Sequence, residues 1–539
     1  MTPNKLLLLG DEAIAQAAID AGVSGAYAYP GTPSSEILEY LIDSKEAKQK
    51  GIVTQWTANE KTAVEAAIGT SYVGKRTIVA MKHVGLNVAA DAFINSALTG
   101  ANGGMIVVTA DDPSMHSSQN EQDNRFYGDF AHVPILEPSN QQEAYDMCYY
   151  GFQLSEKFHL PVLLRITTRV AHSRAGVLRK ESLPQNQINL PSDLKQYILL
   201  PALARKRWSK VLSIQPSLLE ESENSTFNQY INGNDKSIGI IASGIAFNYV
   251  MENFHGANPY PIVKISQYPI PVKMIKKLYK EVDRLIVIEE GYPFIEKMLT
   301  SFLCDNLKVE GKLTGLLPRE GELNPNIVAQ ALGLPNIEGK DIPTFVVGRP
   351  PSFCPGCSHI DSYNALNEAL KDYSKGRVFS DIGCYTLGAT PPFEAINSCV
   401  DMGASIPMAK AASDMGLRPA VAVIGDSTFT HSGMTGLLDA VVYNAPITVI
   451  ILDNSTTGMT GGQPSHANQR LVSICTGLGV NPEHIRIIKP LKNRHQENVQ
   501  IIKEELAYEG VSVIIPTREC VQTLNRRMRT KFKEKEANK

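Results

Sequence analysis

Residues 419–463 read PAVAVIGDSTFTHSGMTGLLDAVVYNAPITVIILDNSTTGMTGGQ, and this stretch decides the fold class. Residues 421–424 and 447–452 are apolar, mostly β-branched runs typical of buried strands, and residues 433–444 between them have helical spacing. A strand, a helix and a strand in this order form a βαβ unit, whose right-handed crossover makes the two strands parallel. We therefore expect an α/β fold in which both strands end at the same edge of a sheet.

Polar side chains follow each of these strands. Asp426 closes the first strand and Asn454 the second, which places a carboxylate and an amide oxygen where doubly wound sheets bind ligands. Mg²⁺ prefers oxygen ligands in octahedral geometry and usually shares them with phosphates. Asp426, Asn454 and a carbonyl near Thr456 could therefore hold magnesium against a diphosphate. The alternative is an ordinary βαβ unit in which the aspartate caps a helix and the asparagine forms a turn.

The same residues resemble a cofactor signature. Gly425-Asp426-Ser427 followed by Asn454 resembles the Gly-Asp-Gly…Asn pattern of thiamine diphosphate enzymes, with serine replacing the last glycine. The segments GDSTFTHSG and ILDNSTTGMTGGQP are similar to the corresponding segments of the alpha subunit of indolepyruvate:ferredoxin oxidoreductases. In that subunit, serine also follows the aspartate. The resemblance implies thiamine diphosphate and Mg²⁺ as cofactors, bound by these residues and Thr456.

Composition sets the class of protein. With 539 residues the chain is too long for one core, and we expect three or four domains. A content of 43% hydrophobic and 20% charged residues is ordinary for a globular protein, and a net charge of −3 gives no reason to expect nucleic acid. No apolar run approaches the length of a membrane span, so we expect a cytoplasmic protein with no membrane partner. Eight cysteines in so long a chain are not a disulfide framework.

Residues 1–195 predict an α/β domain of the pyrimidine-binding type. Strands and helices alternate, and a turn at Thr32 opens a helix that begins near Ser34 and Ser35. Free amides at a helix N-terminus favour an anion such as a carboxylate, although plain N-capping is the alternative. The turn YPGTPSSEI resembles the YP-x-TPSSE turn of 2-oxoacid:ferredoxin oxidoreductases, which implies that Thr32 holds the substrate carboxylate.

Two glutamates lie in a helix expected at about 59–73. A helical glutamate is usually solvated, and we expect that for Glu65. The resemblance implies that Glu60 is the glutamate that hydrogen-bonds the aminopyrimidine of thiamine diphosphate. A carboxylate in that position shuttles a proton and needs a raised pKa, which burial supplies.

Further polar loops are expected at the same edge of this domain. By resemblance they lie near substrate or cofactor, whereas single loop histidines are more often structural. These loops carry Lys82, His83, Asn87, His116, Gln119 and Arg125. The closing segment could serve either the domain interface or a ligand, and it carries Arg165, Arg169, His172 and Arg174.

The rest of the chain divides by composition and resemblance. Residues 196–236 are a polar linker with some helix, and residues 237–345 read as an α/β unit similar to the transketolase C-terminal domain. That unit has no candidate site beyond Glu289 and Glu290 at a strand end. Residues 346–525 form the diphosphate and magnesium domain, in which Asp381 and Gly403 lie on loops expected to line the cofactor pocket. Residues 526–539 are a charged tail. The overall expectation is three doubly wound parallel-sheet domains of the thiamine diphosphate enzyme type.

Four cysteines of the last domain are candidate ligands. Cys354 and Cys357 have the C-x-x-C spacing of zinc, iron-sulfur and redox sites, but a metal needs two further ligands. Cys384 and Cys520 come at strand ends. Resemblance to the beta-type subunits of oxoacid:ferredoxin oxidoreductases implies that these four bind one [4Fe-4S] cluster. Unliganded thiols are the alternative.

The resemblance also implies a reaction and partners. It implies oxidative decarboxylation of an aryl 2-oxoacid, such as indolepyruvate, to an acyl-CoA, with coenzyme A as co-substrate and electrons passing to ferredoxin. A homodimer and a smaller second subunit are expected. Full-length family members continue into a small domain with C-x-x-C-x-x-C-x-x-x-C-P runs, which this sequence does not contain. A non-oxidative thiamine diphosphate-dependent 2-oxoacid decarboxylase is therefore the alternative, and a scaffold subunit without turnover is a third reading.

Overall fold

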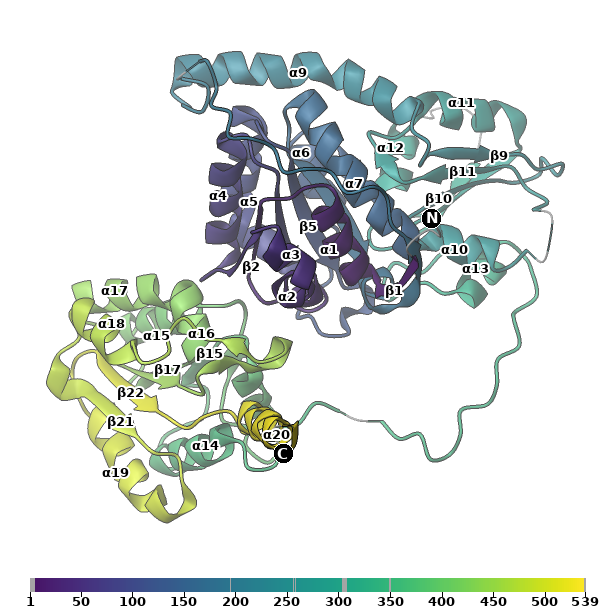
Figure 1. Cartoon of the computed structure of the whole chain (residues 1–539). Coiled ribbons are helices and arrows are strands. Elements are labelled where there is room, and N and C mark those ends of the chain that lie inside the picture. Colours follow the sequence, from purple (N-terminus) through teal and green to yellow (C-terminus); the bar gives the residue numbers. More distant parts are fainter. Residues whose placement is uncertain are drawn as a thin grey trace. The chain divides into compact units, whose positions relative to one another are not determined.

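The computed structural model describes residues 5–193, 195–254, 256, 258–302, 308–348 and 350–537. Its residues gather into two compact units, Met1–Asp341 and Ile342–Lys539, whose elements are labelled in Figure 1. Among the described residues, no helix combines the length and apolarity that a membrane crossing requires. The division of the chain into three domains at the boundaries given above stays a prediction.

The first unit contains a seven-stranded sheet with the order β12-β6-β7-β5-β4-β2-β3. All neighbouring strands are parallel except β12, which runs antiparallel to β6. The strands are β2 (Gly25–Ala28), β3 (Val53–Trp56), β4 (Thr77–Lys82), β5 (Met105–Asp111), β6 (Ile135–Leu136), β7 (Val162–Thr167) and β12 (Gln267–Tyr268). The α/β class expected from the alternating strands and helices is therefore confirmed.

Helices cover both faces of this sheet, because its strands are apolar on both sides. One core forms beneath α1 (Gly10–Asp20), α2 (Ser35–Asp43) and α7 (Gln141–Phe158), and the other beneath α4 (Glu60–Tyr72) and α5 (His83–Thr99). Shorter elements at the rim are α3 (Lys45–Gln49), η1 (Pro113–Met115), α6 (Arg125–Phe130) and α8 (Thr168–His172). The sheet is doubly wound.

The first strand departs from the expected parallel sheet. The apolar run at the N-terminus forms β1 (Lys5–Leu9), but it pairs antiparallel with β8 (Arg174–Leu178) in a separate two-stranded sheet. Leu7 is 68% exposed, so this short strand is not buried on both sides as a central parallel strand would be. The two strands frame the start of α1 and the end of α8.

A second sheet of the first unit has the order β14-β13-β10-β11-β9, with β9 antiparallel to β11 and the others parallel. Its elements are β9 (Gln229–Ile231), β10 (Gly239–Ser243), α10 (Ile245–Met251), β11 (Ile262–Ile265), α11 (Val272–Glu281), β13 (Arg284–Ile288), α12 (Phe294–Phe302), β14 (Lys308–Glu310) and α13 (Pro325–Ala331). The long α9 (Pro201–Glu223) precedes it (Figure 1). One apolar cluster contains side chains from both sheets, which explains why they form a single unit.

The second unit is built on a six-stranded, fully parallel sheet with the order β16-β15-β17-β18-β22-β21. Its strands are β15 (Val378–Ser380), β16 (Ser398–Cys399), β17 (Ala420–Gly425), β18 (Ile447–Leu452), β21 (Ile485–Ile488) and β22 (Ser512–Pro516). The βαβ unit expected from residues 419–463 is confirmed: β17 and β18 pair from Ala420 and Ile447 to Gly425 and Leu452, and α17 (Met434–Val442) connects them.

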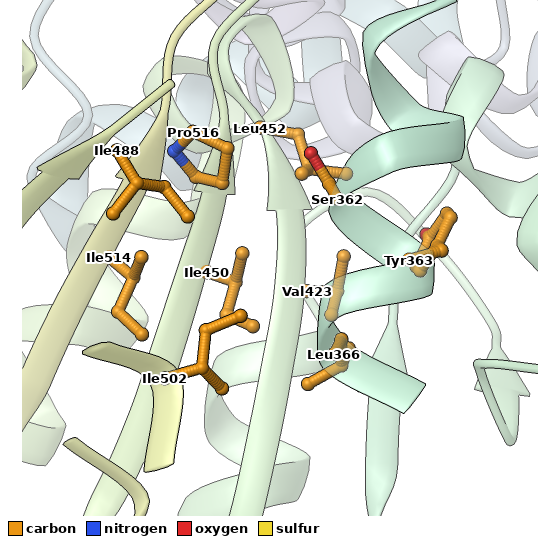
Figure 2. A pocket seen from close by; sticks show the side chains of 10 residues that line it. All are labelled: Ser362, Tyr363, Leu366, Val423, Ile450, Leu452, Ile488, Ile502, Ile514 and Pro516. Carbon is orange, nitrogen blue, oxygen red and sulfur yellow. The ribbon is translucent and has the colours of Figure 1, made fainter. Parts of the chain in front are cut away.

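Helices cover both faces of this sheet as well. The larger helices are α14 (Ser358–Ala369), α15 (Ser405–Asp414), α18 (Leu471–Gly477), α19 (His495–Leu506) and α20 (Val521–Ala537). The shorter elements are η2 (Cys384–Ala389), α16 (Asp426–Thr428), η3 (Phe429–Gly433), β19 (Thr456–Thr457), η4 (Gly458–Thr460), β20 (Gln463–Pro464), η5 (Pro482–His484) and η6 (Lys492–Arg494). Figure 2 looks into the core between α14, α19 and the sheet, where a void of about 10 Å³ is lined mainly by apolar side chains such as Leu366 and Ile450. So small an apolar void is a packing gap and holds no ligand.

Candidate active site

Asp426 lies at the carboxyl end of β17 and is 3% exposed. Its Oδ1 accepts a hydrogen bond from the amide of Ser427 at 2.8 Å, whereas its buried Oδ2 has no hydrogen-bond partner among the described residues. Burial, and after it the charge of Asp453, raises the pKa of Asp426 to about 7. A buried carboxylate oxygen without a partner fits a cation as its missing neighbour, so the residue suits the predicted magnesium site.

Asn454 and Thr456 follow the neighbouring strand β18. The Oδ1 atom of Asn454 accepts a hydrogen bond from the Thr456 amide at 3.0 Å, which closes a tight turn. The hydroxyl groups of Ser427 and Thr457 lie 2.9 Å apart and join this turn to the end of β17. The structure therefore brings Asp426, Asn454 and Thr456 together. It also gives the serine that departs from the Gly-Asp-Gly pattern a clear contact, since glycine has no hydroxyl to make it.

Asp381 and Gly403 hold a loop beside β17. Asp381 is fully buried, and its carboxylate accepts hydrogen bonds from the amides of Gly403 at 3.1 Å and Ser405 at 2.8 Å, and from the Ser405 hydroxyl. Burial raises the pKa of Asp381 to about 6 although these hydrogen bonds oppose it. Gly403 has a φ of +104°, and a Cβ there would lie 2.6 Å from the Cβ of Ser432. The Asp381 carboxylate is thus used to fix the loop at the start of α15.

The four candidate cysteines gather near the Asn454 turn. Arg518 donates a hydrogen bond to the carbonyl of Gly356, between Cys354 and Cys357, at 2.8 Å. The Cys520 amide donates a hydrogen bond to the Asn454 carbonyl at 3.1 Å. Burial, followed by the neighbouring Cys357, Cys520 and Cys354 groups, raises the pKa of the Cys384 thiol to about 12. The four side chains therefore lie within electrostatic reach of one another, on segments that are far apart in sequence.

The spacing of these thiols bears on the metal they suit. A tetrahedral zinc site with Zn–S bonds of about 2.3 Å holds its sulfurs roughly 3.8 Å apart. In the described part of the chain, no three of these sulfurs lie within 4.8 Å of one another, because the only group of three ligand atoms that meets this spacing is elsewhere. A four-iron cluster binds each thiolate to a different iron and so separates them more widely. The spacing of the thiols is therefore compatible with the wider separation that a four-iron cluster requires.

Two buried histidines of this region were missed by sequence reasoning. His359 is 2% exposed, and its Nε2 lies 3.5 Å from the side-chain nitrogen Nδ2 of Asn454. Burial, and after it Arg518, lowers the pKa of His359 to about 4, so the ring is neutral near pH 7. His431 lies in η3, a π-helical turn directly after the Asp426 motif, and such turns are frequent at functional sites. The position of His359 directly after C-x-x-C-Ser was the available signal.

Glu60 is placed as the predicted catalytic glutamate requires. It is the first residue of α4, is 5% exposed, and lies against Gly85 in the first turn of α5. A Cβ at Gly85 would come 2.6 Å from the Glu60 Cγ, so the glycine leaves the space that this side chain fills. Glu65, by contrast, is exposed and forms an ion pair with Lys61. The two glutamates therefore differ in burial as expected.

Thr32 lies in the turn between β2 and α2 and is half-buried. The hydroxyl of Ser35 accepts a hydrogen bond from the Gly31 amide at 3.0 Å, and the hydroxyl of Ser34 donates to the Gly31 carbonyl at 2.8 Å. These two serines therefore stabilise the turn itself. Gly31 packs against Lys82 at the end of β4, where burial lowers the lysine pKa to about 8 against the opposing effect of Asp112. Thr32 and Lys82 could offer a hydroxyl and a cation to a carboxylate.

The neighbouring loops meet over the start of α5. His83 is fully buried; its Nε2 lies 3.0 Å from the Asn120 Oδ1, and its Nδ1 has no partner among the described residues. Asn87 donates a hydrogen bond to Gln122 at 3.0 Å. His116 instead pairs with Glu322 at 3.1 Å on the exposed side. Gln119 is exposed.

Arg125 corrects one expectation. It is fully buried and forms ion pairs with Asp123 at 2.5 Å and Glu289 at 2.9 Å, so it is enclosed between the two sheets of the first unit instead of facing a ligand at the rim. Arg165 is equally buried and pairs with Asp111 at 2.8 Å and with Glu137. Burial raises the pKa of Asp111 to about 7 although Arg165 opposes it. Of the two roles considered for Arg165, the geometry supports the interface role.

Comparison with known proteins defines the class to which this fold and site belong. Residues 16–194 match the thiamine diphosphate-binding region of pyruvate flavodoxin/ferredoxin oxidoreductases, and residues 381–515 match the C-terminal binding domain of thiamine pyrophosphate enzymes. The 2-oxoglutarate:ferredoxin oxidoreductase from Magnetococcus marinus has a similar fold, with a TM-score of 0.52 and 15% identity over 61% of this chain and 65% of that one. These matches place the chain in the class of thiamine diphosphate-dependent 2-oxoacid oxidoreductases.

The particular family follows from curated relatives. Indolepyruvate oxidoreductase subunit IorA of Archaeoglobus fulgidus is 38% identical over 98% of this chain and 88% of its own length. The subunit of the same name from Methanothermobacter thermautotrophicus is 38% identical over 96% of this chain and 87% of its own length. The chain belongs to this family of IorA subunits.

Proposed function

We propose that this chain is the thiamine diphosphate-binding subunit of an enzyme that oxidatively decarboxylates an aryl 2-oxoacid such as indolepyruvate. The overall reaction would convert the 2-oxoacid, coenzyme A and oxidised ferredoxin into acyl-CoA, carbon dioxide, a proton and reduced ferredoxin. The observation that carries the proposal is the buried, unpartnered Oδ2 of Asp426 at the end of β17, beside the Asn454 turn. The family relationship supplies the reaction class.

The second unit would hold the cofactor. Asp426, Asn454 and a carbonyl near Thr456 would bind Mg²⁺, which in turn binds the diphosphate. Gly425 and Ser427 would form the walls beside them, and the loop that Asp381 fixes would lie near the cofactor. When bound, thiamine diphosphate supplies an electron sink for the carbon that loses carbon dioxide.

The first unit would act on protons and on the substrate. Glu60 would exchange a proton with the aminopyrimidine, for which its buried carboxylate at a helix start is suited. Thr32 would donate a hydrogen bond to the substrate carboxylate, and the charge of Lys82 would attract it. Ser34 and Ser35 are occupied in hydrogen bonds to Gly31, so the Thr32 hydroxyl would be the side-chain donor that this turn offers.

The four candidate cysteines would provide the exit route for electrons by holding an iron-sulfur cluster. Oxidation to the acyl level releases two electrons. Cys354, Cys357, Cys384 and Cys520 would hold an iron-sulfur cluster, which would supply one-electron transfer. A Cβ at Gly458, four residues after Asn454, would lie 3.2 Å from the Cys384 sulfur, so the proposed cluster site adjoins the proposed magnesium site. Ferredoxin and a smaller second subunit would take the electrons further.

Anaerobic turnover tests this function. The chain, with and without its partner subunit, is supplied with indolepyruvate, coenzyme A and an oxidised viologen dye. Dye reduction that depends on coenzyme A supports the proposal. Release of carbon dioxide and an aldehyde without dye reduction would instead establish the non-oxidative decarboxylase.

Iron and sulfide analysis of anaerobically purified protein tests the cluster separately. We expect Cys384→Ser to lower the iron content, whereas Cys475→Ser, a buried cysteine on α18, should leave it unchanged. An iron-free protein that still binds thiamine diphosphate would remove the cluster from the proposal and leave electron transfer to the partner subunit.

A further inference from the structure

Three side chains of the first unit that could bind a metal ion lie close together, and none of them belongs to the proposed active site. They are Asp11 in the first turn of α1, Glu36 in the first turn of α2 and His172 at the end of α8. One ligand atom from each lies within 4.8 Å of the other two. The His172 Nε2 is 3.5 Å from a Glu36 oxygen. Two consecutive helices near the N-terminus thus meet the end of a third helix that is remote in sequence.

Asp11 lacks the contacts that a buried carboxylate needs. It is 0% exposed, and neither of its Oδ atoms has a hydrogen-bond partner among the described residues. One oxygen of Glu36 is also buried without a partner. Arg174 pairs with the adjacent Glu12 and so does not compensate Asp11. An uncompensated buried charge is strongly unfavourable, so either a cation or a proton must lie between these oxygens.

We propose that Asp11, Glu36 and His172 bind one divalent first-row transition metal ion. An imidazole nitrogen with two carboxylate oxygens suits ions between the hard Mg²⁺ and the soft thiolate-binding metals, such as Mn²⁺ or Fe²⁺. The side chains of His172 and Glu36 are 34% and 35% exposed, so solvent reaches the site and can supply the remaining ligands. The site is separate from the proposed thiamine diphosphate site, and its existence does not depend on the proposed reaction.

The position of the site gives it a structural consequence. Glu36 belongs to the first turn of α2, directly after the turn that contains Thr32. Gly10, before Asp11, is packed so closely on α8 that a Cβ there would lie 2.1 Å from the Val170 carbonyl oxygen. A bound ion would tie α1, α2 and α8 together and hold the Thr32 turn in place.

The rival occupant is a proton. Burial, and after it the charge of Glu36, raises the pKa of Asp11 well above its usual range, so a protonated Asp11 could donate a hydrogen bond to Glu36. The two occupants predict different responses to an added metal ion, since only the ion requires His172.

Manganese electron paramagnetic resonance distinguishes them. The full-length protein is saturated with thiamine diphosphate and excess Mg²⁺, so that the Asp426 site is filled, and is then titrated with Mn²⁺, which binds thiolates poorly. We expect one Mn²⁺ bound per chain, with echo modulation from a directly bonded imidazole nitrogen. The melting temperature should rise with Mn²⁺ concentration, as it does for any ligand of the folded state.

Variants locate the ion. Asp11→Asn and His172→Gln should each weaken Mn²⁺ binding at least tenfold, and His172→Gln should abolish the nitrogen modulation. Glu12→Gln is the matched control, because this neighbouring carboxylate faces Arg174 and the Leu9 amide. Because His172 is partly exposed, its variant should fold even if Asp11→Asn does not. Absence of bound Mn²⁺, or Mn²⁺ without nitrogen modulation, would overturn the proposal in favour of the shared proton.

Discussion

At the residue scale, two glutamates on one helix have opposite environments. Glu60 is buried at the start of α4, whereas Glu65 is exposed beside Lys61. Glu60→Gln keeps the shape and one hydrogen bond but removes the exchangeable proton. We therefore expect thiamine diphosphate to bind while kcat falls at least ~10²-fold, the usual contribution of general acid-base catalysis. Steady-state kinetics with Glu65→Gln as the control checks this, and a dead Glu65→Gln enzyme would mean that the wrong glutamate was chosen.

Gly85 offers a second test of Glu60 that leaves the carboxylate in the chain. A Cβ at Gly85 would overlap the Glu60 side chain at 2.6–2.7 Å, so Gly85→Ala should displace it. We expect a fall in kcat in the same direction as for Glu60→Gln. Gly69→Ala on α4 is the matched control, because nothing lies within 4 Å of its Cβ, and it should gain up to about 1 kcal/mol of stability. Unchanged kcat in Gly85→Ala would contradict the assigned position of Glu60.

The unpartnered Oδ2 of Asp426 leads to a binding prediction. Asp426→Ala removes the only carboxylate predicted for the magnesium site. Affinity for thiamine diphosphate with Mg²⁺ should therefore fall by more than about 100-fold, beyond the usual effect of changing a metal ligand's hydrogen-bond partner. Calorimetric titration measures it, and Asp414→Ala, an exposed residue of α15, is the control. Wild-type affinity in Asp426→Ala would remove this residue from the site.

Some of these residues could be predicted from sequence and others could not. Asp426 and Asn454 could be predicted because each follows one of two parallel strands, and residues in that position lie at the same edge of the sheet. Arg125 was misplaced, since a charged loop residue normally remains exposed and its partner Glu289 comes 164 positions later, directly after a strand of another sheet. His359 was missed because its proximity to Asn454 depends on how α14 packs beside β18.

At the element scale, periodicity identified the central elements and failed at the edges. The strands β17 and β18 were found because they are long and apolar on both faces, as central parallel strands must be. The pairing of β1 with β8 could not be predicted, because the sequence of a short, partly exposed strand does not show which other strand it will pair with. The separation of the four thiols also depends on loop conformations that spacing in sequence does not determine.

Buried carboxylates at the end of β13 make the first unit sensitive to pH. Burial raises the pKa of Glu290 from 4.5 to about 7, against the opposing charge of Lys312. The folded state therefore holds this proton more tightly than the unfolded state. The stabilisation is complete below pH 4.5 and is lost as pH rises through about 7, with a slope of at most about 1.4 kcal/mol per pH unit.

Glu290→Gln should remove this part of the pH dependence. The free energy of unfolding in urea, measured between pH 5 and 8, should fall less steeply with pH in the variant than in the wild type. Tryptophan fluorescence reports on the first unit alone, because both tryptophans, Trp56 and Trp208, lie in it. Glu320→Gln is the exposed control. Equal slopes in all three proteins would show that Glu290 titrates normally.

At the scale of the whole molecule, the predicted catalytic groups are divided between two compact units. Glu60 and Thr32 belong to the first unit, and Asp426 and Asn454 to the second. The second unit also exposes apolar side chains on and beside α17, where Val442 and Tyr443 are 67% and 69% exposed. Such a patch is typical of a surface that another protein covers. The homodimer expected from the sequence leads to a prediction, namely that Glu60 of one chain and Asp426 of the other act on the same cofactor.

Complementation between two inactive chains tests that arrangement. Glu60→Gln chains keep Asp426, and Asp426→Ala chains keep Glu60, so a mixed dimer with shared sites contains one complete site and one doubly damaged site. Random exchange of equal amounts makes half of the dimers mixed, so activity should recover to about one quarter of the wild-type value. Each variant alone should stay inactive after the same unfolding and refolding or subunit exchange. No recovery, despite mixed dimers shown by differently tagged chains, would mean that both groups act within a single chain.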